Sequence, residues 1–259
     1  MNYEEFQKKV SLSKQDICRE VFSENRKSIR VKKENTVLKN LERIFSATLK
    51  ISNKKGFQAM SMRDLSNETN LSMGALYSYF SSKEDLLEMM QQQRRAITLR
   101  ILAEHIALET EPIAKLRVAI QVHLYLSEAM QPWFYFSYME AKNLSKKEQQ
   151  LAVEGELYTE KIIEDILQEG QRQEVFEIQN CQLTASIIKA MMQDWYLKRA
   201  KHAKRNIAVD QYARFVFEFV AAFILKSENN SNISGSNETK GPVDESYRPA
   251  NGNPCRRRA

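Results

Sequence analysis

The chain has few of the residues that build disulfide-bonded or metal-stabilised folds. It contains three cysteines and three histidines among 259 residues. The cysteines lie far apart and show no C-x-x-C spacing, which argues against a disulfide framework and a zinc site. The histidines form no ligand pattern with neighbouring carboxylates, so we expect no bound metal and no cofactor. These residues are Cys18, Cys181 and Cys255, and His105, His123 and His202.

Long apolar runs are also missing. The most apolar segment, residues 215–225, has about half of the ~20 residues needed to cross a bilayer. The first nine residues alternate between acidic, polar and basic types, without the apolar run of a signal peptide. We therefore expect a cytoplasmic protein with no membrane partner.

Catalytic motifs are absent as well. The sequence shows no glycine-rich phosphate loop, no activated nucleophile and no Glu-x-x-His pair. Four glutamates recur along one predicted helix, where a solvated charged face explains them: Glu154, Glu156, Glu160 and Glu164. We predict no catalytic residue, and an all-α enzyme is the least favoured function.

Positive charge is concentrated in the N-terminal third. Residues 1–83 carry 16 Lys or Arg against 9 Asp or Glu, a net charge of +7, whereas residues 84–226 carry 18 against 20. Basic side chains that neutralise phosphates release counterions and supply most non-specific affinity for DNA. The asymmetry therefore favours a nucleic-acid partner for the N-terminal part.

Residues 61–83 predict two short helices joined by a tight turn, with a third helix at the end. Ser61 and Asp64 have the spacing of a capping box, and Ser72 can cap the second helix. Gly74 and Ala75 at the start of that helix allow a partner to approach the backbone closely. A unit this small has little core of its own, so it is typical of a helix-turn-helix that presents one helix to the DNA major groove.

Residues 35 to about 95 resemble the DNA-binding domain of the TetR family of bacterial regulators. The resemblance rests on a helix over residues 37–55 ending in Lys-Lys-Gly-Phe, the opening Ser-x-Arg-Asp-Leu, the Leu-Tyr-x-Tyr-Phe helix, and Ser-Lys-Glu-Asp-Leu-Leu at the start of a long fourth helix. It implies an all-α fold in which a three-helix DNA-binding domain is joined by that long helix to a helical effector-binding and dimerisation domain.

The domain division expected on this basis has four parts. A basic extension covers residues 1–34, and the DNA-binding domain covers residues 35–95 with its helix-turn-helix motif at 61–80. The effector-binding and dimerisation domain covers residues 96–226. Its helices are expected at 113–130, 133–139, 145–171 (capped by Ser145 with Glu148), 180–204 and 209–226. A disordered tail is expected over residues 227–259, which are rich in Asn, Ser, Gly and Pro.

The resemblance also implies which residues contact double-stranded DNA. Phosphate contacts fall on donors that suit them, namely Ser61, Arg63, Tyr77, Tyr79 and Lys83. Base edges face Ser72, Met73, Gly74 and Ala75. Of these, Met73, Gly74 and Ala75 cannot make a bidentate hydrogen bond to guanine or adenine, so we expect DNA shape to contribute to specificity.

A basic stretch precedes the DNA-binding domain and has two readings. As an arm it can follow the phosphate backbone or reach a minor groove. As a plain solvated leader it has no partner. The residues are Arg26, Lys27, Arg30, Lys32 and Lys33.

The second domain is expected to hold a homodimer and a ligand. Family members pair through their last two helices, and these two helices carry more apolar residues here than one face can bury, including Ile187, Phe215, Phe219 and Phe223. Aromatic and Met residues can line an effector pocket between helices, although each is more often core: His105, Tyr125, Trp133, Tyr138, Tyr158, Met191 and Trp195. The pattern resembles the branch that senses fatty acyl-CoA or related lipids, whose phosphates would meet Arg172, Lys198, Arg199 and Lys201.

The favoured function is a repressor that a small, largely apolar effector releases from a palindromic operator. An effector-dependent activator is one alternative, because the ligand can favour either the conformer that binds DNA or the conformer that does not. A helical adaptor that binds only protein is another, but it leaves the basic N-terminal part without a purpose.

Overall fold

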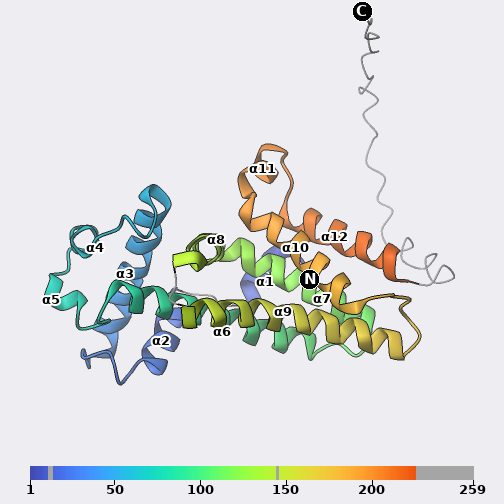
Figure 1. The fold of residues 1–259 in the computed structure, drawn as a ribbon, viewed down its shortest axis with the longest axis horizontal. Coiled ribbons are helices and arrows are strands. Elements are labelled where there is room, and N and C mark those ends of the chain that lie inside the picture. Colours follow the sequence, from blue (N-terminus) through green and yellow to red (C-terminus); the bar gives the residue numbers. More distant parts are fainter. Residues whose placement is uncertain (11–13, 144–145, 226–259) are drawn as a thin grey trace, which may run out of the picture. The chain divides into compact units, whose positions relative to one another are not determined.

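A computed structural model of the chain describes residues 1–10, 14–143 and 146–225, and these residues are overwhelmingly helical (Figure 1). They contain no strand, only an isolated antiparallel bridge between Phe176 and Leu225. The all-α prediction is therefore confirmed. Residues from Met1 to Lys226 form one compact unit. The tail predicted at 227–259, which includes Cys255, lies outside the described residues.

The DNA-binding domain contains α3 (Glu34–Lys55), α4 (Met62–Thr69) and α5 (Met73–Leu76), of which α4 and α5 form the helix-turn-helix motif. Apolar residues at helical spacing on α3 are fully buried, among them Leu41 and Ile44, and they pack with Leu65 of α4 and Leu76 of α5. Gly56 ends α3 with a φ of 81°, a conformation that glycine adopts without steric cost. The chain can therefore turn sharply from α3 towards α4.

Serine caps fix where these helices start, as predicted. In the capping box of α4, the Asp64 backbone N–H donates to Ser61 Oγ and the Ser61 N–H donates to Asp64 Oδ2. The Ala75 N–H donates to Ser72 Oγ at the start of α5. Lys55 Nζ donates to the Asp64 carboxylate at 2.7 Å, and this bond and those from Ser61 hold the pKa of Asp64 well below its usual range. The cap therefore stays ionised at neutral pH.

A long helix, α6 (Lys83–Ile106), runs from this domain into the next one (Figure 1). Ser82 caps it, as its Oγ accepts from the Asp85 N–H at 3.0 Å. The helices α7 (Pro112–Ala129) and α8 (Gln131–Glu140) pack against α6, and Pro112 occupies the first turn of α7. A single continuous helix thus joins the two domains.

The second domain is completed by a short 3₁₀ turn, η1 (Ala141–Asn143), and by α9 (Lys146–Arg172), α10 (Cys181–Leu197), α11 (Arg199–Lys204) and α12 (Val209–Ile224). Gly170 lets α9 end against Phe176, since a Cβ there would lie 2.0 Å from the Phe176 ring. The predicted Ser145 cap with Glu148 falls on residues whose side chains are not described.

The prediction of one helix over residues 180–204 is wrong, because the chain breaks at Lys198 between α10 and α11. The break folds His202 back onto the Trp195 ring, with centroids 5.0 Å apart. His202 Nε2 also lies 2.9 Å from an Asp194 carboxylate oxygen. Burial alone would raise the pKa of Asp194, but hydrogen bonds from Lys201, Lys198 and His202 outweigh it and hold this pKa below its usual range. These contacts between α10 and α11 override the helical pattern of the sequence.

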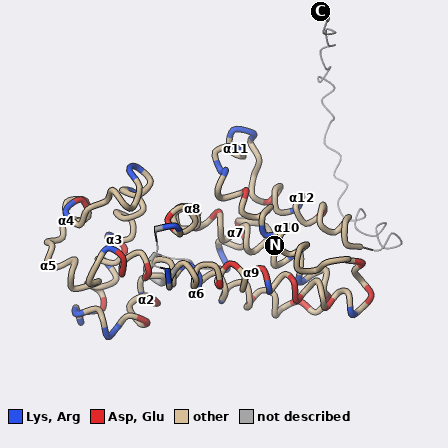
Figure 2. The backbone as a smooth tube through the Cα atoms, in the orientation of Figure 1, with Lys and Arg blue, Asp and Glu red and all other residues tan. Residues whose placement is uncertain are grey.

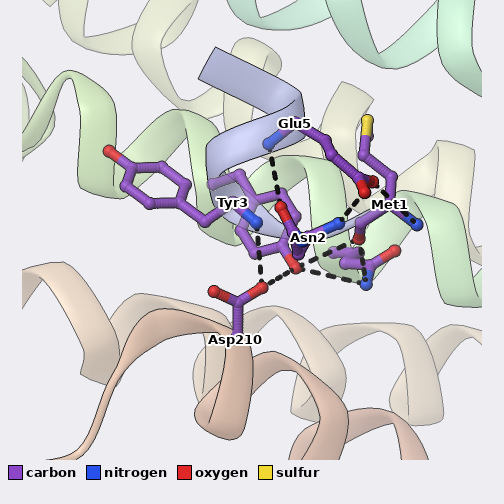
Figure 3. Close-up of polar contacts among 7 residues, drawn as sticks. Met1, Asn2, Tyr3, Glu5 and Asp210 are labelled. Carbon is purple, nitrogen blue, oxygen red and sulfur yellow. Dashed lines mark hydrogen bonds and ion pairs between the residues drawn. The ribbon is translucent and has the colours of Figure 1, made fainter. Parts of the chain in front are cut away.

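The N-terminal extension is not a simple leader, since it forms α1 (Tyr3–Lys9) and α2 (Lys14–Glu24). Phe6 of α1 is fully buried, and its ring lies 5.5 Å from that of Tyr125. The Tyr3 backbone N–H donates to Asp210 at the start of α12, and the Tyr125 hydroxyl donates to the same carboxylate oxygen (Figure 3). The first residues of the chain are thus fixed to α7 and α12 of the second domain.

The helix α2 packs on the DNA-binding domain. Val21 and Phe22 are buried against α3 and α6. Glu20 accepts hydrogen bonds from Gln93 and Arg100, both on α6, at 2.9 and 2.8 Å. The extension therefore contacts the second domain through α1 and the DNA-binding domain through α2.

We expect Phe6→Ala to lower the free energy of unfolding by about 3 kcal/mol, because a fully buried aromatic side chain leaves a cavity when truncated. The matched control is Lys9→Ala on the exposed side of the same helix, with an expected change within about 0.5 kcal/mol. Chemical denaturation at fixed protein concentration measures both, and amide hydrogen exchange of residues 1–10 reports whether α1 detaches. Equal stability of the two variants would mean that α1 is not held as described.

Candidate DNA-binding surface and effector domain

The helix α5 presents the residues predicted to face DNA bases. Ser72, Met73 and Gly74 are exposed, and Ala75 is half-buried. Gly74 has open space around it, since a Cβ there would meet no atom within 4 Å. Tyr77, which follows the helix, is 42% exposed. The structure therefore brings five of the predicted contacts together around one short helix.

Two of the other predicted phosphate contacts lie at the start of α4. Ser61 and Arg63 are both exposed there. Arg63 has a charged donor that suits a phosphate. The Ser61 hydroxyl already donates to Asp64 at 2.6 Å, so it also serves the capping box.

The prediction that Tyr79 contacts phosphate is wrong. Its side chain is 1% exposed and lies in the core of the DNA-binding domain. The hydroxyl accepts a hydrogen bond from Asn40 Nδ2 of α3 at 2.8 Å. Burial raises the pKa of Tyr79, so this hydroxyl stays neutral. Tyr79 positions α5 against α3 instead of touching DNA.

Lys83 also has an internal role. Its ammonium group donates to the backbone carbonyls of Gln58 and Met60 at 3.1 and 3.3 Å, and it lies 5.2 Å from the Phe57 ring centroid. It therefore ties the start of α6 to the loop between α3 and α4. A phosphate contact by Lys83 stays a prediction.

The basic stretch after α2 lies next to the α5 region. The Arg30 backbone N–H donates to the Ser78 carbonyl at 2.8 Å, directly after α5. All of its basic side chains are exposed: Arg26, Lys27, Arg30, Lys32 and Lys33. Figure 2 shows Lys and Arg gathered on the segment between α2 and α3. This proximity favours the arm reading over the solvated leader.

The predicted effector-lining residues do not surround one cavity. His105 and Tyr125 hold α1 through Phe6, and Trp195 is fully buried, with its Nε1 donating to Glu128. Trp133 packs on Phe45 beside an open groove of about 420 Å³ between α2, α3 and α8. Tyr138 and Tyr158 are exposed, and Met191 lies beside another groove between α10 and α12. The aromatic and Met character of these residues predicted one shared pocket. In the folded chain they lie in separate places and do not line a common cavity.

Three of the four basic residues expected to meet ligand phosphates already have acidic partners. Arg199 forms a bidentate pair with Glu128 at 2.8 and 2.9 Å. Lys198 and Lys201 both pair with Asp194. Only Arg172, exposed at the end of α9, has no ion pair among the described contacts of this set. A phosphate site formed by these four residues stays a prediction.

An apolar stripe runs along α10 and α12. On α12 the residues split cleanly, because Phe217 and Val220 face the core while Phe215, Phe219 and Phe223 are 66%, 60% and 69% exposed. Ile187 of α10 is 53% exposed beside them and lines the same groove of about 350 Å³ as Phe219 and Phe223. All four residues predicted for the dimer interface are thus on the surface.

Among the described residues, no helix is long and apolar enough to cross a membrane. No group of three or more His, Cys, Asp or Glu side chains gathers as metal ligands in this part of the chain.

An exposed short helix beside a basic segment, supported by two packed helices, defines a helix-turn-helix DNA-binding protein. Residues 44–90 match the family model described as bacterial regulatory proteins, tetR family, and residues 109–220 match that of the tetracyclin repressor-like C-terminal domain. The chain belongs to the TetR family of transcriptional regulators. It is accordingly not an enzyme.

Named relatives agree with this assignment. The chain is 24% identical over 121 residues to the HTH-type transcriptional regulator HbdR of Aromatoleum sp. (strain CIB), a match that covers 47% of this chain and 53% of HbdR. The chain thus spans about half the length of this relative.

Solved structures show the same fold. The TetR family regulator PfmR of Thermus thermophilus superposes with a TM-score of 0.62 at 23% identity, over 69% of this chain and 96% of PfmR. FadR of Bacillus subtilis, in complex with stearoyl-CoA, superposes with a TM-score of 0.57 at 19% identity, over 69% of this chain and 96% of FadR.

Proposed function

We propose that the protein is a homodimeric repressor that binds a palindromic operator and leaves it when a largely apolar effector binds the second domain. The observation that carries this proposal is the exposed α5 surface with Tyr77 and Arg63, set beside the basic segment that Arg30 ties to Ser78. A regulator of this kind acts where the DNA is, so the expected cytoplasmic location is part of the proposal.

The apolar stripe on α10 and α12 supports the dimer. Three exposed phenylalanines spaced by four residues lie on one face of α12, and Ile187 extends that face onto α10. Exposed apolar area of this kind marks an interaction site in a water-soluble domain. A second copy of the chain is the occupant we propose, because a twofold pair buries the same stripe on both subunits and presents two α5 helices to two half-sites.

The contacts between α8 and the DNA-binding domain support control by an effector. Phe136 of α8 packs edge-on against Phe57 with centroids 5.7 Å apart, and Glu140 accepts a hydrogen bond from the Phe57 backbone N–H at 3.1 Å. A ligand that shifts α6 or α8 would therefore also move α3 and α5. The dimer would have two conformers, one with its α5 helices spaced for two half-sites and one with a different spacing. A ligand that binds the second conformer more tightly raises its population and so weakens DNA binding.

The class of effector we propose is a fatty acyl-CoA or a related lipid-like molecule. Its support is the aromatic and Met-rich second domain and the likeness in fold to FadR, which was solved with stearoyl-CoA. An effector-dependent activator is the second candidate, because the same contacts transmit a change of either sign.

Selection of genome fragments by the purified full chain at about physiological salt tests the DNA-binding part of this proposal. We expect enrichment of one palindromic sequence, and weaker binding of that sequence by Tyr77→Ala and Arg63→Ala. If an acyl-CoA releases the protein from this sequence, the protein is a repressor that the ligand inactivates. If an acyl-CoA makes the protein bind this sequence more tightly, it is an effector-dependent activator. Enrichment of no sequence with or without acyl-CoA would contradict the proposal.

We expect the basic arm to contribute through phosphates. The triple variant Arg30→Gln, Lys32→Gln, Lys33→Gln should lower affinity for specific and non-specific DNA alike and reduce the salt slope of log K by roughly 2–3, since each phosphate contact contributes about one unit. Fluorescence anisotropy across a salt series measures the slope. Lys142→Gln, Lys146→Gln, Lys161→Gln removes equal charge from the region of α9 as the control. An unchanged salt slope of log K in the triple variant would mean that the basic stretch is a solvated leader without a DNA contact.

A further inference from the structure

Four helices of the second domain enclose a group of basic side chains that the sequence pattern did not single out. Arg94 of α6, His123 of α7 and Lys189 of α10 line one small cavity together with Glu156 of α9. His123 and Lys189 are only 2% and 5% exposed. The cavity has a volume of about 10 Å³, which is about the space of one water-sized group.

The nitrogen atoms of this group have too few acceptors. His123 Nε2 and Arg94 Nε are both buried without a hydrogen-bond partner. The ion pair of Lys189 Nζ with Glu156 Oε2 spans 3.8 Å, longer than a hydrogen bond, and the same oxygen already accepts from Gln193 at 2.9 Å. Buried polar groups normally have partners, so the Arg94 Nε–H indicates a missing acceptor, and His123 Nε2 donates to the same acceptor in the tautomer that carries its proton there.

The charges are unbalanced in the same sense. Burial lowers the pKa of Lys189 to about 8, and burial together with Lys189 and Arg94 lowers the pKa of His123, whose imidazole is therefore neutral. Arg94, Lys189 and Arg95 thus line the cavity with one carboxylate, that of Glu156, while Glu160 acts on Lys189 and Glu88 and Glu154 act on Arg95 from outside the cavity. Taking charges out of water costs several kcal/mol per ion unless they are paired, so one further negative charge would stabilise this group.

We propose that Arg94, His123 and Lys189 bind the carboxylate headgroup of an effector that is an organic acid with an apolar body. The inference rests on the proposed function and narrows its lipid-like effector to a free acid, because the thioester of an acyl-CoA has no carboxylate at the end of its acyl chain. A carboxylate carries one negative charge, and one of its oxygens fits the water-sized space. The Phe134 ring, 5.2 Å from the Arg94 guanidinium and 5.8 Å from the His123 ring, supplies an apolar wall.

The position of the group also suits control of DNA binding. Arg94 belongs to α6, the helix that begins in the DNA-binding domain at Lys83, whereas Lys189 belongs to α10, which also carries Ile187 of the apolar stripe. An anion held between them draws α6 and α10 together. The ligand would thereby change the position of the helix that carries the DNA-binding domain.

Calorimetric titration of the full chain with acetate, hexanoate and decanoate tests the inference, with decanamide, inorganic phosphate and decanoyl-CoA as parallel probes. We expect decanoate to bind at least 10-fold more tightly than decanamide, which has the same body without the charge. Lys189→Met should weaken decanoate binding at least 10-fold and should raise the melting temperature of the ligand-free protein, because it removes an unbalanced buried cation. The matched control Lys161→Met, on the exposed face of α9, should change neither.

Equal binding of decanoate and decanamide, equal behaviour of the two lysine variants, or no binding of any acid would overturn the inference. Tighter binding of phosphate or decanoyl-CoA than of decanoate would reassign the headgroup and overturn it as well. Should Lys189→Met fail to fold, His123→Asn takes its place with the same expected weakening. Operator selection by the ligand-free chain is independent of these results, so failure of the headgroup and failure of the DNA-binding function are distinguishable.

Discussion

The variant Phe219→Glu is expected to be monomeric and to bind the operator at least about 100-fold more weakly than the native chain, a loss of about 2.7 kcal/mol. Phe219 is 60% exposed at the middle of the apolar stripe, so a glutamate there is solvated in the single chain and does not disturb its fold. In a dimer built on the stripe, the same glutamate would be buried without a partner. Sedimentation equilibrium measures the mass, and anisotropy measures operator binding.

The control for this experiment separates the stripe from other exposed apolar residues. Leu108→Glu introduces the same charge at a site that is 79% exposed between α6 and α7, and it should leave both mass and affinity unchanged. Leu157→Glu tests the rival apolar face of α9, where Leu157 is 55% exposed. Dissociation by Leu157→Glu but not by Phe219→Glu would place the interface on α9 and contradict the proposed dimer.

The second large effect is expected from Gly74→Glu, which should abolish specific operator binding, again by about 100-fold or more. A Cβ at Gly74 meets no atom within 4 Å, and glutamate is a better helix former than glycine, so the fold should be unchanged or slightly more stable. On DNA, however, the new carboxylate would meet the major groove between two rows of phosphates. Circular dichroism and thermal melting establish the fold, and anisotropy establishes the loss.

Gly74→Ala is the graded companion to this variant. Its methyl group fits the free protein equally well and carries no charge, so we expect a smaller loss that reports close approach of the α5 backbone to DNA. The Leu108→Glu protein again serves as the charge-matched control. Retention of full affinity by Gly74→Glu would mean that α5 does not enter the groove.

The elements that the sequence predicted well are those set by neighbouring residues. The caps at Ser61 and Ser72 are satisfied by backbone N–H groups three residues away, so their signals are local. The start of the long α6 at Lys83 follows from similarly local signals, since its cap and first turn are neighbours in the sequence. The exposure of Met73 and Tyr77 also follows, because a helix of one turn has little surface to bury.

The features that sequence reasoning missed are set by contacts between distant residues. Tyr79 has a hydroxyl suited to phosphate, but its burial depends on Asn40, 39 positions earlier. The helix α1 depends on Tyr125 and Asp210, which no pattern near Phe6 reveals. Likewise, the cavity formed by Arg94, His123 and Lys189 appears only when four helices come together. A buried His on an otherwise apolar stretch of α7 was the one signal available, and alone it is not specific.

The central claim is that two copies of the chain, joined through α10 and α12, read two half-sites with their α5 helices. The measurement that tests it most directly is the mass and affinity of the complex on the selected operator and on a copy with five base pairs inserted between its half-sites. Because half a helical turn moves the second half-site to the opposite face of the duplex, two chains should bind the native operator and affinity for the respaced one should fall to the non-specific level. Equal binding to both DNAs, or one chain per operator, would contradict the account.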